Sequence, residues 1–270
     1  MSVANFIPEL WSQQLLIAFR KQLVFGSLVN RNYEGEIRAQ GDTVKITTPG
    51  AITVGNYTGT VTYETPDSTQ QALLIDQHKY WAFKLRDVDQ AQANVSLMQA
   101  YMQEAAYALA DNVDQNISAL YTEAQHSIDI TLTGSAPDSM YDKMVEAGEA
   151  LDLQNVPRGN RWIVMSPKGY SALLKTDEFI HATAAGDNVV RTGEVGSIAG
   201  FRVFTSNNLV LATTRRYLFG TNAAITFAEQ VISTEAMRLE AAFDDGVRGQ
   251  LVFGRKVVRP AALGVLNATE

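Results

Sequence analysis

Apolar residues recur along this chain at two spacings, and each spacing predicts a different kind of element. From Asp87 to Ser127 they follow intervals of three and four residues, and neither proline nor glycine interrupts the run. This pattern predicts a one-sided amphipathic helix well beyond the usual three turns, with Asp87 as its N-cap. The stripe comprises Val88, Ala91, Val95, Met98, Met102, Ala105, Leu109, Val113, Ile117 and Leu120. Because a charged coiled-coil pattern is missing, we expect the helix to lie across a body rather than to pair with another helix.

Alternating apolar and polar residues mark a strand at 42–48, ahead of this helix. A second strand is predicted at 72–85, and between the two lies a stretch, 49–71, that is rich in Thr, Gly and Tyr and has no core-forming run. The pair predicts a hairpin that carries an extended arm. A two-stranded hairpin is marginally stable alone in water, and a loop of this length is usually functional. We therefore expect the arm to need a partner surface.

The second half of the chain indicates a mixed arrangement of helices and strands, so that the whole chain is of the α+β class. Helices are predicted at 140–154 and at 167–174, the latter opened by a proline at its first position. Strands are predicted at 161–166, 200–205, 216–220, 223–227 and 249–259. The segment 181–200 has the composition of a loop.

At the other end of the chain, residues 9–30 predict a short amphipathic helix followed by an apolar strip. Leu10, Trp11 and Phe19 are among its apolar positions. Such a terminal segment must dock either on its own body or on a neighbouring molecule. The first residues lack the basic stretch and the long apolar run of a signal peptide.

Composition narrows the function classes. The chain has 270 residues, 46% of them hydrophobic, no cysteine and a formal charge of −7. A sizeable core is expected, whereas disulfides, zinc–cysteine sites and ordinary nucleic-acid binding are disfavoured. Between Asp87 and Asp142 there are acidic residues but no lysine or arginine. This segregation is typical of a solvated helix face, and it is also what a surface that must repel a polyanion needs.

Motifs for chemistry are lacking. The histidines at 78, 126 and 181 have no metal-ligand spacing, and there is no G-x-S-x-G elbow. The glycine-rich run 193–200 lacks the phosphate-loop spacing, and Asp244-Asp245-Gly246 has the composition of a turn. We therefore expect no catalytic residue, no metal site and no cofactor.

The order of these parts is similar to that of a known family. Four segments carry the likeness: 42–46 at the start of the hairpin, 75–89 at the returning strand and helix entry, and 219–227 and 243–260 in the closing region. Together they resemble the major capsid protein of tailed bacteriophages, the Hong Kong ninety-seven fold. The resemblance covers nearly the whole chain and includes no catalytic motif.

The resemblance implies a division of labour. Residues 1–32 would be an N-terminal arm, 33–86 an extended loop over the neighbouring subunit, 87–159 with 241–270 a peripheral domain with its spine helix, and 160–240 an axial domain. Expected subunit contacts in the arm and the hairpin are Leu10, Trp11, Phe19, Thr53, Tyr57 and Tyr63. Glu104, Asp111 and Asp114 would lie on an inner acidic face that repels packaged DNA.

The expected function is self-assembly, through pentamers and hexamers, into an icosahedral shell around a double-stranded DNA genome bound without sequence specificity. A separate scaffolding protein and a portal would be further partners. Assembly would occur in the host cytoplasm and the product would be the virion. Some members of the family crosslink a loop lysine to a neighbour, but residues 47–73 contain no lysine, so no crosslink is expected. An encapsulin-like shell for protein cargo is the nearest alternative, and a cytoplasmic α/β enzyme is a more distant one.

Overall fold

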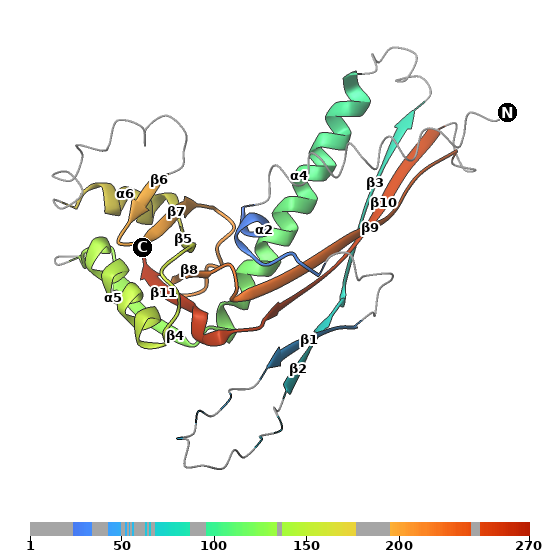
Figure 1. Ribbon diagram of the computed structural model, residues 1–270. Coiled ribbons are helices and arrows are strands. Elements are labelled where there is room, and N and C mark those ends of the chain that lie inside the picture. Colours follow the sequence, from blue (N-terminus) through green and yellow to red (C-terminus); the bar gives the residue numbers. More distant parts are fainter. Residues whose placement is uncertain are drawn as a thin grey trace.

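Three limbs meet near the middle of the molecule in the computed structural model (Figure 1). One is a rounded body around a six-stranded sheet, one is a long limb of three strands beside a helix, and one is a two-stranded hairpin. The structure describes residues 24–33, 43–49, 68–86, 96–133, 137–176, 195–238 and 244–270, with isolated positions between 50 and 67. Among these residues no helix is both long and apolar enough to cross a membrane.

The six-stranded sheet runs in the order β4-β11-β8-β5-β7-β6. Its strands are β4 (His126–Thr131), β5 (Arg161–Met165), β6 (Val195–Ile198), β7 (Phe201–Thr205), β8 (Arg215–Thr221) and β11 (Leu263–Thr269). β11 is parallel to β4 and antiparallel to β8, and β5 is parallel to β7. Every residue of β5 is buried, because the sheet is covered on both faces at its centre.

Two helices cover one face of this sheet. Helix α5 (Met140–Leu153) begins at Ser139, whose side chain accepts a hydrogen bond from the Asp142 backbone N–H. Helix α6 (Pro167–Leu174) begins at Ser166, which caps the Gly169 N–H in the same way. On the opposite face, the buried Trp162 meets Phe25 edge-to-face at 6.3 Å between ring centroids. The short helix α2 (Phe25–Leu28) therefore closes the core from that side.

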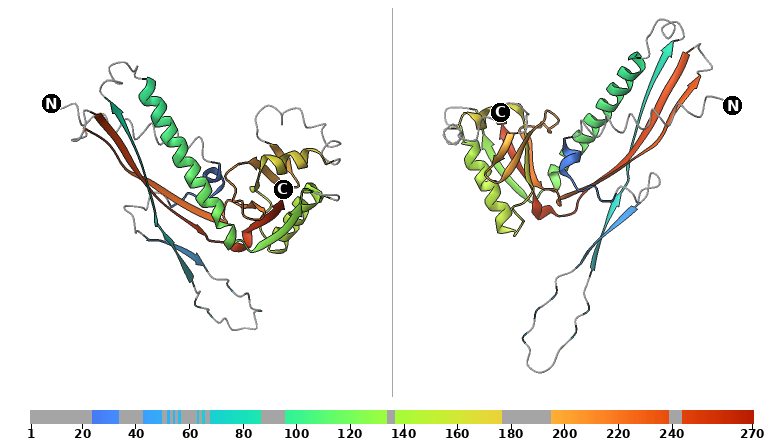
Figure 2. Two further views of the ribbon diagram at one scale, coloured as in Figure 1. Left: turned by 180° about the vertical axis from the view of Figure 1, so that it is seen from behind. Right: turned by 45° about the horizontal axis from the view of Figure 1, so that its top comes forward.

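The long limb combines three strands with helix α4. Strand β10 (Asp244–Val257) lies between β3 (Gln77–Arg86) and β9 (Ile225–Arg238), antiparallel to both. Helix α4 (Ser96–Ser118) runs beside this sheet and continues as the 3₁₀ turn η3 (Ala119–Glu123) (Figure 2). Trp81 stacks on Phe83, which in turn packs against Tyr101 of α4. Gly249 is required opposite Trp81, since a Cβ there would come within 2.6 Å of the indole.

The hairpin is formed by β1 (Thr43–Pro49) and β2 (Ser68–Leu74). The expected second strand, 72–85, is therefore two strands, because the chain changes sheets at Ile75 and Asp76: β2 pairs with β1, whereas β3 pairs with β10. The expected hairpin is present, and Figure 1 shows β1 and β2 projecting away from the long limb; of the residues between the two strands the structure describes isolated positions.

Most of the predicted elements in the second half are confirmed, including α5, β5 and α6. Three predictions were wrong. His126 begins β4 and does not end the long helix, which gives way to η3. The Asp244-Asp245-Gly246 run is the start of β10 and not a turn. Part of the expected loop 181–200 forms β6. For β4 and the start of β10, pairing with the distant strands β11 and β3 overrides the local preference, whereas β6 pairs with the neighbouring β7.

The sheets also group the chain differently from the expected domain boundaries. β4 and β11 were expected in the peripheral domain, yet both belong to the sheet that contains β5, β7 and β8. Conversely, β9 was expected in the axial domain, and it pairs along its length with β10 in the long limb. Boundaries at 159 and 240 therefore separate strands that are hydrogen-bonded neighbours.

Candidate assembly surfaces

The hairpin is anchored at its base by a small core of its own. Val44, Ile46, Leu73 and Ile75 are buried together against Ala228 of β9 and Val252 of β10. Backbone contact at this point is close, because a Cβ on Gly254 would lie 2.4 Å from the Leu74 carbonyl oxygen. The Lys256 ammonium group also donates to the Ala72 carbonyl oxygen at 2.9 Å. The base of the arm is thus fixed by the long limb.

Toward its tip the arm exposes apolar side chains. Tyr63 is 90% exposed, Val54 94% and Ile52 74%. Water-exposed aromatic and aliphatic groups at the end of a projection are typical of a contact surface. The exposure of Tyr63 agrees with its expected role, although its contact stays a prediction. Thr53, Tyr57, Leu10, Trp11 and Phe19 lie outside the described residues.

The segment 24–33 is docked on its own subunit. Asp114 of α4 accepts hydrogen bonds from the backbone N–H groups of Phe25 at 3.2 Å and Val24 at 3.4 Å. Asn30 then pairs with Thr226 as a parallel bridge at the edge of β9, and Arg31 forms an ion pair with Glu229. The end of the predicted N-terminal arm is therefore part of the subunit fold, through contacts that are mostly main-chain.

One expected member of the acidic face is placed elsewhere. Glu104 is exposed and Asp111 is half-buried, but Asp114 is only 3% exposed. Burial raises the pKa of Asp114 to about 7, and the nearby Asp111 carboxylate adds to the shift, against hydrogen bonds from Val24, Phe25 and Asn208. The expectation for Asp114 was wrong because the apolar stripe and the docked α2 enclose its position on the helix.

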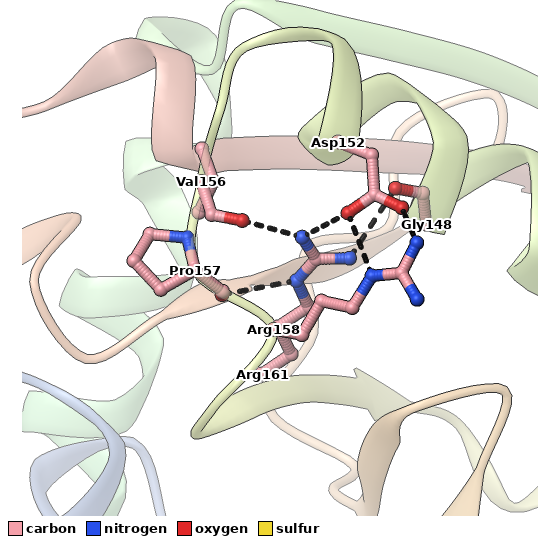
Figure 3. Close-up of polar contacts among 6 residues, drawn as sticks. All are labelled: Gly148, Asp152, Val156, Pro157, Arg158 and Arg161. Atoms are coloured by element: carbon pink, nitrogen blue, oxygen red, sulfur yellow. Dashed lines mark hydrogen bonds and ion pairs between the residues drawn. The ribbon is translucent and has the colours of Figure 1, made fainter.

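A second surface lies along α5, and two arginines, Arg158 and Arg161, are among its residues. Arg161, buried at the start of β5, donates to the carbonyl oxygens of Gly148, Val156 and Pro157 and to the Asp152 carboxylate at 2.6 Å (Figure 3). Every nitrogen of this guanidinium therefore has an acceptor, which is what a buried cation requires. Arg161 thereby fixes the loop that joins α5 to β5.

Asp152 binds a second arginine as well. Its carboxylate accepts from Arg158 at 2.7 Å, and the hydrogen bonds from Arg158 and Arg161 lower the pKa of Asp152. Arg158 itself is 83% exposed, and it lies at the end of a groove of about 560 Å³. Tyr141, Val145, Glu149, Leu153 and the turn Ala199–Gly200 are among the residues that line it. This groove, called the α5 groove below, is partly apolar and open to solvent.

A polar cluster lies where α6 meets the sheet. Glu270 accepts hydrogen bonds of 2.5 Å from both the Ser166 and the Tyr217 hydroxyl groups, and Arg215 lies 3.3 Å from its other oxygen. Burial opposes ionisation of Glu270, but these partners outweigh it and lower the pKa. The cluster ties β5, β8 and β11 together and faces no described cavity, so we regard it as structural.

Metal ligands are not gathered anywhere in the described ranges, which hold no group of three or more His, Asp or Glu side chains able to hold an ion. His78 lies near Gln250 across two strands, and His126 is within 3.1 Å of the Ala261 carbonyl oxygen. These two histidines thus contact strand and loop partners and not each other, and His181 lies outside the described residues.

The arginine network and the α5 groove were missed in the sequence. One signal was present: Arg161 opens an otherwise apolar strand, and an arginine in that position needs acceptors nearby. The apolar positions Tyr141, Val145 and Leu153 at helical spacing were a second signal, but they are not separable by sequence from the buried stripe of the same helix.

Known proteins resemble this chain in sequence and in fold. The model of a family described as phage capsid protein matches residues 70–266. Among solved structures, one of Mycobacterium phage Che8 has 30% sequence identity and a TM-score of 0.73, and the alignment covers 91% of each chain. A capsid structure of the cyanophage P-SCSP1u has 18% identity and a TM-score of 0.68, over 92% of this chain and 88% of the other.

A virus-like particle from Pyrococcus furiosus shares the fold at 15% identity and a TM-score of 0.56, over 94% of this chain and 96% of that one. No curated protein sequence matches this chain.

Proposed function

The chain belongs to the phage capsid protein family and forms a capsid shell, and from this premise we propose that the shell is icosahedral, is built from pentamers and hexamers, and encloses the double-stranded DNA genome of a tailed phage. The observation that carries the proposal is the 30% identity to the protein of Mycobacterium phage Che8 over 91% of both chains. Identity at that level extends over almost the full length of both chains.

The physical features of the subunit support this function. A projecting hairpin with Tyr63 90% exposed gains stability only when a neighbour covers it. Closed symmetric assemblies repeat one contact many times, so each contact can be weak. A soluble enzyme needs none of these projections. We therefore propose a structural role without catalysis, in the virion, with assembly in the host cytoplasm.

Further partners follow from the same proposal. A separate scaffolding protein would set the shell size, a portal would occupy one vertex, and DNA would be held without sequence specificity. Glu104 and Asp111 of α4 would face the interior, where carboxylates keep the packaged polyanion from adhering. If both side chains are found on the outer surface of an assembled shell, this orientation is wrong.

An encapsulin-like compartment is the second candidate, because the virus-like particle from Pyrococcus furiosus and the phage capsids share one fold, which therefore does not separate the two functions. The contents of the shell separate the two. A phage capsid holds nuclease-protected DNA when purified from infected or induced cells, whereas a compartment holds a defined protein cargo.

The first test is electron microscopy and sedimentation of the protein expressed in bacteria, alone and with the neighbouring genes of its source. Uniform icosahedral shells with separable pentamers and hexamers are expected. Compact monomers under every condition, with the hairpin resistant to protease, would contradict the proposal.

Boiling the shells in detergent should release single chains, because the segment 47–73 has no lysine; a covalent ladder on a gel would show a crosslink.

A further inference from the structure

A small hairpin on the body presents an exposed leucine on the side that faces α4. The segment 210–216 turns back on itself, with a bridge between Leu211 and Arg215 and a hydrogen bond from the Arg216 N–H to the Val210 carbonyl oxygen. Leu211 at its tip is 61% exposed, and Ala212 and Thr213 beside it are exposed as well. We call the residues 211–213 the body tip.

The base of this hairpin is firmly held, so the exposed tip is a fixed feature. Leu209 is buried in the main core at 4% exposure. The Ser118 hydroxyl of α4 donates to the Asn208 carbonyl oxygen at 2.8 Å. Because the two preceding residues are fixed in this way, the subunit presents Leu211 to solvent at little further cost in conformational entropy.

The α5 groove lies on the other face of the six-stranded sheet. Phe201 of β7 points toward α5, since a Cβ on Gly148 would lie 3.6 Å from its ring. Trp162 of β5 points the opposite way, toward Phe25, and α4 lies on that side (Figure 1). Asn208, just before the small hairpin that carries the body tip, is hydrogen-bonded to Ser118 of α4, and the groove is lined by α5. The two surfaces therefore belong to opposite flanks of the same body (Figure 2).

We propose that the body tip of one copy inserts into the α5 groove of a second copy, so that the bodies associate head to tail in a ring. This inference rests on the proposed function and specifies one of its contacts. Surfaces on opposite flanks form a heterologous contact, which closes into a ring when the rotation permits. A pentamer and a hexamer are rings of this kind.

The charges of the two surfaces favour the body tip as the occupant of the α5 groove. The groove holds two guanidinium groups, Arg158 and Arg161, and two carboxylates, Glu149 and Asp152, so its formal charge cancels. Residues 206–214 contain no ionisable side chain, so insertion of the tip buries no unpaired charge.

Arg158, which lines the α5 groove, also offers hydrogen-bond donors to the body tip. The exposed Arg158 has N–H groups beyond those that bind Asp152, and they can donate to backbone carbonyl oxygens of the tip. Val145 and Leu153, 46% and 73% exposed, offer the apolar contact for Leu211.

The natural absence of cysteine permits a direct test. The double variant Leu211→Cys with Leu153→Cys is assembled under reducing conditions and then oxidised. If the contact exists, non-reducing gels show chains linked into pentamers and hexamers, and both single variants remain monomeric. A matched control combines Leu211→Cys with Tyr80→Cys, an equally exposed position on β3, and should remain monomeric.

Shells that form normally and yield no linked chains, for this pair and for Ala212→Cys with Val145→Cys, would overturn the contact and leave the shell function intact. If the unmodified protein forms no shell under any condition, the proposed function fails instead.

A second measurement is the protein concentration needed for shell assembly. Leu211→Ser should raise it about tenfold, whereas Leu174→Ser, at an exposed leucine of α6, should leave it unchanged; equal effects would contradict the proposal.

Discussion

The six-stranded body and the β1–β2 hairpin contain the same kinds of apolar residue but differ in how far the subunit itself buries them. In the body, Trp162, Ile163 and Val164 are completely buried, because α5 and α6 cover one face of the sheet and α2 and α4 the other. In the hairpin, Val44 and Leu73 are buried against the base provided by β9 and β10, and the described apolar side chains beyond the strands, Ile52, Val54 and Tyr63, are exposed.

This difference shows where the subunit ends as a folding unit and where it begins to depend on the assembly. Apolar burial supplies most of the stability of a domain, at roughly 25 cal/mol per Å². The comparison can be tested by substitutions that affect the body, the junction, the base of the hairpin and its tip.

The largest effect is expected in the body. Trp162→Ala removes a fully buried ring that packs against Phe25, so the subunit should lose about 3–5 kcal/mol of unfolding free energy. Urea unfolding followed by circular dichroism measures it. The matched change Tyr80→Ala, at an exposed aromatic of β3, should shift the midpoint by less than a tenth as much. Similar losses for the two would mean that the body is not the stable unit.

The stability contributed by the junction between the body, the N-terminal segment and α4 should depend on pH. Asp114 has a pKa raised to about 7, so the folded state retains a proton that the unfolded state releases near pH 4. Stability from this group is therefore present at low pH and is lost as pH rises from about 4 to about 7. Between pH 5 and pH 7 the loss should be about 2 kcal/mol.

Asp114→Asn isolates this contribution, since the amide oxygen can still accept the Val24 and Phe25 N–H bonds but carries no charge. Urea unfolding at pH 5, 6 and 7 should show the unfolding free energies of the two proteins diverging, with the variant more stable at pH 7. Parallel pH profiles would show that Asp114 titrates normally. Asp111→Asn, one turn away and half-buried, should change the slope much less.

The base of the hairpin should give a smaller and more local effect. Leu73→Ala opens a cavity in the small cluster against Val252, and we expect about 1 kcal/mol in global stability because the body can remain folded without the hairpin. Hydrogen exchange should accelerate in β1 and β2 and stay unchanged in β5. Uniform acceleration throughout the chain would show that the hairpin and the body fold as one cooperative unit.

The smallest effect on the subunit is expected at the tip. Tyr63→Ser changes a side chain that is 90% exposed, so the unfolding free energy should move by less than about 0.5 kcal/mol. Shell assembly, followed by light scattering, should nevertheless slow or require more protein. Normal assembly would show that Tyr63 makes no subunit contact, and the control Thr43→Ser, exposed at the hairpin base, should have no effect on either quantity.

The sequence predicted the elements whose signal is local. The stripe Met102, Leu109, Val113 and Ile117 did become the buried face of α4, and the proline start of α6 was predicted correctly from Pro167, whereas Ser166, expected to end a strand, is its N-cap. The sequence predicted the β1–β2 hairpin as well. The candidate surfaces were predicted less well. Tyr63 is exposed as expected, whereas Asp114 is buried and the α5 groove was not foreseen.

The sequence by itself determined which segments form most of the helices and strands, which face of α4 avoids water and, through the order of its parts, which family the chain resembles. Only the tertiary structure decided that β4 and β11 share a sheet with β5, that 72–85 divides between two sheets, and that Asp114 faces α2. Periodicity records which face of an element is apolar, because that depends on neighbours a few residues away. It does not show which distant element covers that face, because the free energy of that packing comes from contacts between residues that meet only when the chain folds.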